Sequence, residues 1–114
     1  MTSHERQILL DILIAAEDAL TYVRGLTFDE FVASSLVRRG VLHCLAVIGE
    51  AAGRVHAAEA EVPALPLRKM KNLRNVIIHN YEGVDLVTIW EIVTNQLPLI
   101  TTVLDPLFPE RKSQ

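Results

Sequence analysis

The sequence has almost no cysteine and no histidine pattern suited to a metal. Cys44 is the only cysteine among 114 residues, so the chain can form neither an intrachain disulfide nor a zinc site built on cysteines. Because Cys44 stands in an apolar helical run, we expect it to be a small core residue. No histidine pair lies three to five residues apart with a carboxylate or thiolate at ligand spacing; the histidines are His4, His43, His56 and His79. We therefore expect neither a metal site nor another cofactor.

The chain also lacks an overall positive charge. Its formal net charge is −3 and its isoelectric point is about 5.7, so the field of the whole chain does not attract nucleic acid, and any contact with RNA must depend on local charge. Residues 1–5 show no basic stretch followed by an apolar run, and Asp11 interrupts the richest early hydrophobic segment. Both observations argue against a leader and an early membrane span, and we expect a cytoplasmic protein that does not contact a membrane.

No segment alternates between apolar and polar residues as a strand would, and no internal repeat is present. Half of the residues are hydrophobic, which is enough for one core in a single domain over residues 1–114, with residues 109–114 as a frayed tail. The apolar spacing predicts an all-α protein, an up-and-down bundle of four main helices with an additional short helix.

Local signals mark the first two helices. Capping boxes at residues 2–5 and 27–30 predict the starts of a long helix that ends before Gly25 and of a short helix around Phe31. Ser34 or Ser35 can cap the next helix.

That next helix is predicted to run from Leu36 to about Ala60, with apolar residues at alternating four- and three-residue spacing. Glycine inside a helix is unfavourable by about 1 kcal/mol relative to alanine. We therefore expect a packing reason, such as the close approach of another helix, for Gly40, Gly49 and Gly53.

A second stripe follows the same predicted helix away from the apolar seam and consists of His43, Val47, Glu50 and Arg54. One interpretation is an exposed face on which Glu50 and Arg54 form an ion pair at four-residue spacing. The other is that His43, Glu50 and Arg54 line a catalytic cleft.

Prolines and caps divide the last part of the chain. Pro63 and Pro66 predict a linker before a helix that starts near Leu67. Asp85 is a good N-cap for a final helix, and Pro98 is expected to kink or interrupt it.

The segment from Arg74 to Tyr81 combines a cation, an imidazole and a phenol within two apolar helical turns. An arginine can bind a phosphate through two parallel hydrogen bonds, and a histidine that titrates near neutrality can move the proton of a ribose hydroxyl. The segment therefore indicates a site that handles phosphodiesters. At about 100° per residue, Arg74 and His79 point roughly 140° apart. We expect the helix to end near His79, and the site to be shared between two copies of the chain.

Four cations precede or belong to this segment: Arg68, Lys69, Lys71 and Arg74. A solvated helix face is the ordinary explanation of such a cluster. Binding of the RNA backbone by Arg68, Lys69 and Lys71 is the functional one.

Further motifs accompany this segment: Asp11-Ile12-Leu13 with Tyr22, Gly25-Leu26 and Phe31, Ile48-Gly49-Glu50-Ala51-Ala52, Pro63 with Pro66, Leu73-Arg74-Asn75, Gly83-Val84-Asp85, Trp90-Glu91 and Leu97-Pro98. Together they resemble the HepT-type toxins of the HEPN family over roughly residues 11–107. Two positions depart from the family pattern. Ala33-Ser34-Ser35 stands where relatives usually carry an aspartate, and Leu67 stands where a tryptophan is common.

The resemblance implies a homodimeric, metal-independent endoribonuclease, the toxin of a type VII toxin–antitoxin pair, whose two Arg-x4-His motifs meet in a cleft at the two-fold axis. It implies an RNA substrate such as tRNA or mRNA. The implied partner is a minimal nucleotidyltransferase of the MntA type. That antitoxin uses ATP and magnesium to transfer AMP to a tyrosine, which corresponds to Tyr81 here.

Under this interpretation His79 transfers protons, Arg74 stabilises the charge on the phosphorus, and Asn75 orients the imidazole or binds the phosphate. A different class of function remains open, a non-catalytic helical dimer that binds a nucleotidyltransferase as an adaptor or substrate-binding subunit. It would not use His79 as an acid or base. The ring of Tyr81 would then simply pack beneath its loop.

Overall fold

The computed structural model describes residues 1–55, 62–79 and 83–113, and at residues 76, 78, 79 and 113 only the backbone. Within these ranges every regular element is helical, which confirms the predicted all-α class. The longest helices are α1 (Ser3–Val23), α3 (Ser35–Ala52) and α5 (Leu67–His79), and the short α2 (Phe28–Ala33) joins α1 to α3.

The final helical run has several parts. It consists of α6 (Leu86–Glu91), the π-helical turn η2 (Ile92–Gln96), α7 (Leu97–Leu104) and the 3₁₀ turn η3 (Asp105–Leu107). The widened turn ends at Gln96, two residues before Pro98, whose nitrogen carries no hydrogen for the carbonyl one turn earlier. The predicted interruption at Pro98 is thus confirmed. By length and composition alone, the run Leu86–Leu107 could cross a bilayer. A core helix of a soluble protein passes the same test.

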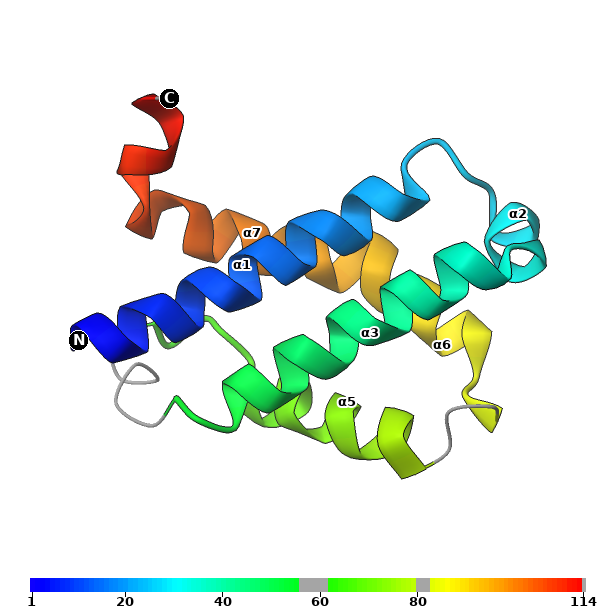
Figure 1. Ribbon diagram of the computed structural model, residues 1–114, viewed down its shortest axis with the longest axis horizontal. Helices are drawn as coiled ribbons and strands as arrows, with labels where there is room; N and C mark the ends of the chain where they lie inside the picture. Colours follow the sequence, from blue (N-terminus) through cyan, green and yellow to red (C-terminus); the bar gives the residue numbers. More distant parts are fainter. Residues whose placement is uncertain (56–61, 80–82, 114) are drawn as a thin grey trace.

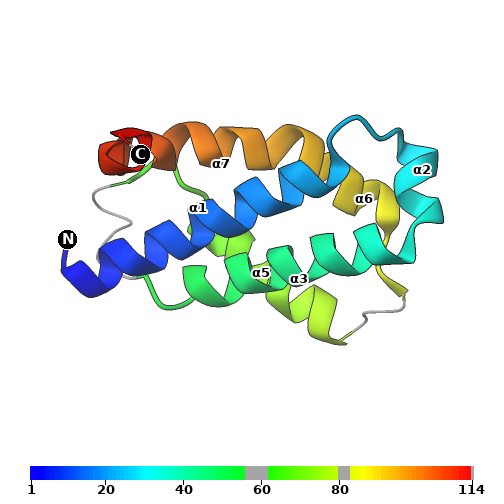
Figure 2. The same ribbon diagram turned by 45° about the horizontal axis from the view of Figure 1, so that its top comes forward.

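The helices run alternately up and down and form a flat body of 41 × 33 × 19 Å (Figure 1). α1 lies beside α3 on one side and α7 on the other, and α5 packs against the far side of α3. The view turned by 45° shows the same order (Figure 2). α3 is therefore flanked by α1 and α5 along most of its length.

The capping signals act as predicted. The Thr2 hydroxyl accepts a hydrogen bond from the Glu5 N–H at 3.1 Å, and a reciprocal capping box joins Thr27 and Glu30. Ser34 caps α3, and Asp85 caps α6 by accepting from the Val87 N–H at 3.0 Å. Gly25 follows α1 with φ +77°, a conformation that favours glycine.

The prediction that α3 continues to about Ala60 was wrong, because the helix ends at Ala52. Gly53 follows it, and the N–H groups of Arg54 and Val55 already bond in turns to the carbonyls of Ala51 and Ala52. Glycine is a poor helix former, and Val55 is buried at the point where the chain leaves the helix.

The core is mainly aliphatic, and within the described ranges it contains no buried polar or charged residue. Cys44 is buried, as expected. Burial raises the pKa of its thiol to about 11, and the nearby Asp18 carboxylate adds to this shift. At the α2 end, Trp90 is half-buried and its ring centroid lies 5.3 Å from that of Phe31 and 6.0 Å from that of Phe28.

The C-terminal segment is held against α1. Pro109–Ser113 forms the 3₁₀ helix η4, in the region for which the sequence suggested a frayed tail. Arg6 donates to the Leu107 carbonyl at 2.8 Å, forms an ion pair with Glu110, and lies 4.5 Å above the centroid of the Phe108 ring. A second set of ion pairs joins the residues Arg111 to Glu17 and Lys112 to Asp105.

Candidate functional site between α3 and α5

Helices α3 and α5 approach each other most closely at a glycine. A Cβ atom on Gly49 would lie 2.8 Å from the backbone nitrogen and from the Cβ of Arg74, and 2.8 Å from the carbonyl oxygen of Met70. Only a residue without a side chain allows this approach. The packing reason expected for the glycines of α3 is therefore confirmed at Gly49, and it fixes the backbone of Arg74 against α3.

Directly after the end of α3, Gly53 faces Lys71, but at a longer distance. A Cβ on Gly53 would lie 3.7 Å from the Cγ of Lys71, an ordinary contact distance. The stem of Lys71 thus passes over Gly53. Because the two helices are antiparallel (Figure 1), Gly49 pairs with Arg74 and Gly53 pairs with Lys71.

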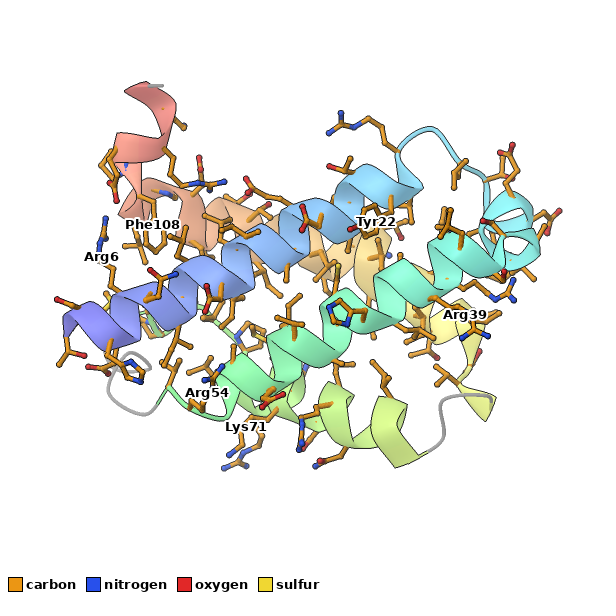
Figure 3. All side chains as sticks on the ribbon, in the orientation of Figure 1. Arg6, Tyr22, Arg39, Arg54, Lys71 and Phe108 are labelled. Atoms are coloured by element: carbon orange, nitrogen blue, oxygen red, sulfur yellow. The ribbon has the colours of Figure 1, made fainter. Side chains whose placement is uncertain are left out.

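These contacts line a surface hollow of about 310 Å³, which we call the α3–α5 depression. Apart from two glycines, its lining residues are polar or charged, and they come from two turns of each helix: Gly49, Glu50, Gly53 and Arg54 on α3 and the turn after it, and Lys71, Asn72, Arg74 and Asn75 on α5. Figure 3 shows Arg54 and Lys71 at the same end of the helix pair.

At the other end of the depression, Glu50 forms an ion pair with Arg74. The Glu50 Oε2 atom lies 3.9 Å from the Arg74 Nε atom, and both side chains are substantially exposed. Among the ion pairs of the described residues, Glu50 appears with Arg74 on α5 and not with Arg54 on its own helix. An Nε contact leaves the two terminal nitrogens of the guanidinium available for an anion.

The residues of the stripe that begins at His43 line two separate hollows, one on each side of α3. His43 and Val47 line a second hollow of about 400 Å³ between α1 and α3, together with Asp11 and Tyr22. Glu50 lines the α3–α5 depression, and Arg54 lines both hollows. The residues predicted to line one cleft are thus divided between the two sides of α3.

The cations of α5 are divided as well. Lys71 and Arg74 line the α3–α5 depression, whereas Lys69 lines a hollow of about 320 Å³ against α7, beside the exposed Leu99. Arg68 is exposed and lines neither. The two-residue step from Lys69 to Lys71 turns an α-helix by about 200°, which places their side chains on opposite faces.

The remaining predicted site residues are placed only in part. Asn75 lines the α3–α5 depression beside Arg74. The described part of α5 reaches His79, and the residues that would show whether the helix ends there, 80–82, lie outside the described residues. The side chain of His79 and the whole of Tyr81 lie outside the described residues, and so does His56. The described histidines and carboxylates form no cluster suited to a metal ion.

Sequence reasoning predicted Arg74 and Asn75, but it missed the pairing of glycines with cations across the helices. A signal for it was present, since Gly49 and Gly53 are four residues apart and Lys71 and Arg74 are three apart. Each spacing is about one helical turn, so each pair can meet the other across an antiparallel contact.

The chain is similar to known proteins over most of its length. A family model described as ribonuclease HepT-like matches residues 12–107. "Putative RNase MJ1380" of Methanocaldococcus jannaschii is 33% identical over 96 residues, which cover 83% of this chain and 88% of the relative. "Probable ribonuclease HepT" of Thermococcus cleftensis is 29% identical over 99 residues, covering 86% and 90%. No solved structure gives a significant match.

Proposed function

The chain belongs to the HepT-like ribonuclease family, and from that premise we propose that it is a metal-independent endoribonuclease acting as the toxin of a type VII toxin–antitoxin pair. One observation in the structure carries the proposal. Arg74 lines an open depression beside Asn75, with its backbone packed against Gly49 and its Nε atom near Glu50. A guanidinium held in this way is suited to stabilise charge on a phosphate.

The proposed reaction is an internal transfer of the phosphodiester bond. The ribose 2′-oxygen attacks the phosphorus while the bond from phosphorus to the 5′-oxygen breaks. A base accepts the 2′-hydroxyl proton, and an acid donates a proton to the leaving 5′-oxygen. The products are a 2′,3′-cyclic phosphate and a 5′-hydroxyl, so protons and bonds balance without a metal or other cofactor.

His79 is assigned the proton transfers, because an imidazole with an ordinary pKa of about 6.5 can act as acid or base near neutrality. Arg74 stabilises the negative charge that grows on the equatorial oxygens of the phosphorus. Asn75 lies in the same depression and can donate to the phosphate from its amide.

We further propose that a homodimer completes the site. Arg74 lines the depression against α3, and residues five apart on a regular helix, as Arg74 and His79 are in sequence, are expected to point about 140° apart. Two copies of the chain related by a two-fold axis can each supply one guanidinium and one imidazole to a shared cleft. Sedimentation should therefore show a dimer, and a monomer with full activity would contradict this arrangement.

The proposed antitoxin is a nucleotidyltransferase of the MntA type, which would use ATP and magnesium to transfer AMP to the Tyr81 hydroxyl. The adenylate adds a bulky anion close in sequence to Arg74, where it would compete with RNA for the same cation. Intact-mass measurement after incubation with the nucleotidyltransferase, ATP and magnesium tests this step. The expected gain is one AMP on the wild type and none on Tyr81→Phe.

Cleavage of single-stranded RNA in EDTA is the central experiment. The wild type should release 5′-hydroxyl products, and Arg74→Gln and His79→Ala should each reduce kcat by about a hundredfold or more. The exposed Arg24, at the end of α1, supplies the control Arg24→Gln. Undiminished cleavage by His79→Ala would refute the assignment. If the chain binds the nucleotidyltransferase but never cleaves RNA or arrests growth, it acts as an adaptor.

A further inference from the structure

The two ends of the α3–α5 depression carry different charges. At one end, the Glu50 carboxylate lies near the Arg74 guanidinium and offsets its charge. At the other end, Arg54 and Lys71 bring two cations together, and the ion pairs of the described residues include neither of them. The depression therefore has a net positive end beyond the arginine assigned to catalysis.

The contacts between helices explain why these two cations meet. Lys71 runs beside Gly53, where a Cβ would lie 3.7 Å from its Cγ, so its stem packs against the turn that follows α3. Arg54 is the next residue after Gly53, so its side chain starts directly beside that contact. Both residues are exposed, so their charged groups remain accessible to a ligand.

The two cations of α5 that line the depression are close enough to reach neighbouring phosphates of one strand. Lys71 and Arg74 are three residues apart and share a face, with a rise of about 4.5 Å between them along the helix. An anionic chain lying in the depression can therefore touch both cations at consecutive phosphates. The depression lies between two packed helices, whose axes are typically about 8–10 Å apart. This distance is smaller than the diameter of a nucleic-acid duplex.

We propose that Arg54 and Lys71 form a second phosphate subsite, which binds the phosphate next to the scissile one in single-stranded RNA. This inference rests on the proposed ribonuclease function. The Arg54 fork can bind two phosphate oxygens at once, and the Lys71 ammonium adds a point charge. The subsite positions the strand and carries no part of the bond-breaking step, so it should act on binding and not on chemistry.

Binding is measured first, in a His79→Ala background that leaves RNA intact. The probe is a fluorescently labelled single-stranded RNA of mixed sequence, titrated at several salt concentrations. Arg54→Gln and Lys71→Gln should each weaken binding several-fold and reduce the slope of log affinity against log salt by about 0.7, the value for one phosphate contact on a single strand. Arg24→Gln is the control of equal charge, and melting temperatures confirm that each variant is folded.

The variant Lys69→Gln distinguishes a specific phosphate subsite from a general attraction of RNA to the positive charge of α5. Lys69 is two residues from Lys71 but lines the hollow against α7. The subsite predicts a smaller change from Lys69→Gln than from Lys71→Gln. Equal changes in the two variants would mean that RNA responds to the charge of the whole cationic run, and would overturn the proposal.

Cleavage supplies the second readout, in the otherwise wild-type protein. On long single-stranded RNA, Arg54→Gln and Lys71→Gln should raise KM several-fold and leave kcat unchanged. On dinucleoside monophosphates, which have a single phosphate, both variants should match the wild type. If the wild type cleaves and binds RNA but these variants behave like it, the subsite alone is refuted. If the wild type neither binds nor cleaves RNA, the proposed function fails with it.

Discussion

Gly49 and Arg74 are in contact across helices α3 and α5, so that a Cβ on Gly49 would lie 2.8 Å from the backbone nitrogen of Arg74. The contact couples the packing of the bundle to the position of the arginine assigned to catalysis. Glu50, the next residue of α3, reaches the Nε atom of the same arginine. Gly49 and Glu50, neighbours on α3, thus contact the backbone of Arg74 and lie near its guanidinium.

Gly49→Ala should therefore lower both stability and activity. Overpacking typically destabilises by about 1–3 kcal/mol, and the better helix propensity of alanine offsets about 1 kcal/mol of this. Urea unfolding should show a net loss of up to about 2 kcal/mol, and RNA cleavage should fall as Arg74 moves. Gly53→Ala is the matched control, because its nearest contact is 3.4 Å. Equal effects at the two glycines would contradict the close-contact explanation.

Glu50→Gln should affect catalysis more than stability. The Glu50–Arg74 pair is exposed to solvent, and exposed pairs contribute at most about 1 kcal/mol to folding. Removing the carboxylate frees Arg74 from its partner, so kcat should fall. KM should fall too, because the depression loses a negative charge that repels RNA. Glu91→Gln, at an exposed position of α6, serves as the control. A rise in KM would contradict this role.

Arg6→Ala should loosen the C-terminal segment. Arg6 bonds the Leu107 carbonyl and lies above the Phe108 ring, and these contacts together contribute about 1–2 kcal/mol. Thermal unfolding should show a lower Tm, and amide exchange should accelerate in residues 105–112. Arg39→Ala removes the same charge at an exposed position of α3 and should leave both unchanged. Unchanged exchange in Arg6→Ala would show that the segment is held by other contacts.

Cys44 should be inert in the folded protein. Its pKa is raised to about 11, chiefly by burial, so at about pH 8 nearly all of the thiol is protonated, and only the thiolate reacts with alkylating agents. Mass spectrometry after iodoacetamide treatment should show slow modification in buffer and fast modification in denaturant. Similar rates in the two conditions would mean that the thiol is not buried in solution.

Asp85 should make α6 sensitive to acid. The hydroxyl of Thr88 and the N–H of Val87 donate to its carboxylate and lower its pKa below the ordinary 3.8. A lowered folded-state pKa stabilises the protein above the unfolded pKa, and this stabilisation is lost as the pH falls through the folded value. Urea unfolding from about pH 5 to about pH 2 should therefore show a larger loss in the wild type than in Asp85→Asn. The asparagine still caps the helix but does not titrate. Equal losses of stability in the wild type and Asp85→Asn would mean that other carboxylates cause the acid sensitivity.

Much of the fold followed from interactions between residues a few positions apart. The caps at Thr2, Thr27, Ser34 and Asp85, and the interruption before Pro98, were predicted and are present. The length of α3 was not predicted, because apolar spacing continued past Gly53 whereas the helix did not. The periodicity of apolar residues alone does not indicate where a glycine allows the chain to leave the helix.

The sequence by itself determined the helical class and the starts of most helices, since caps, prolines and periodic apolar residues act within a turn or two. Its motifs also carried the resemblance to the family. Only the tertiary structure decided that Lys71 and Arg74 share a hollow while Lys69 faces α7, and that Glu50 reaches Arg74 rather than Arg54. The reason is physical. These relationships depend on which helix packs against which face and at what distance, and here the missing side chain of Gly49 sets that distance.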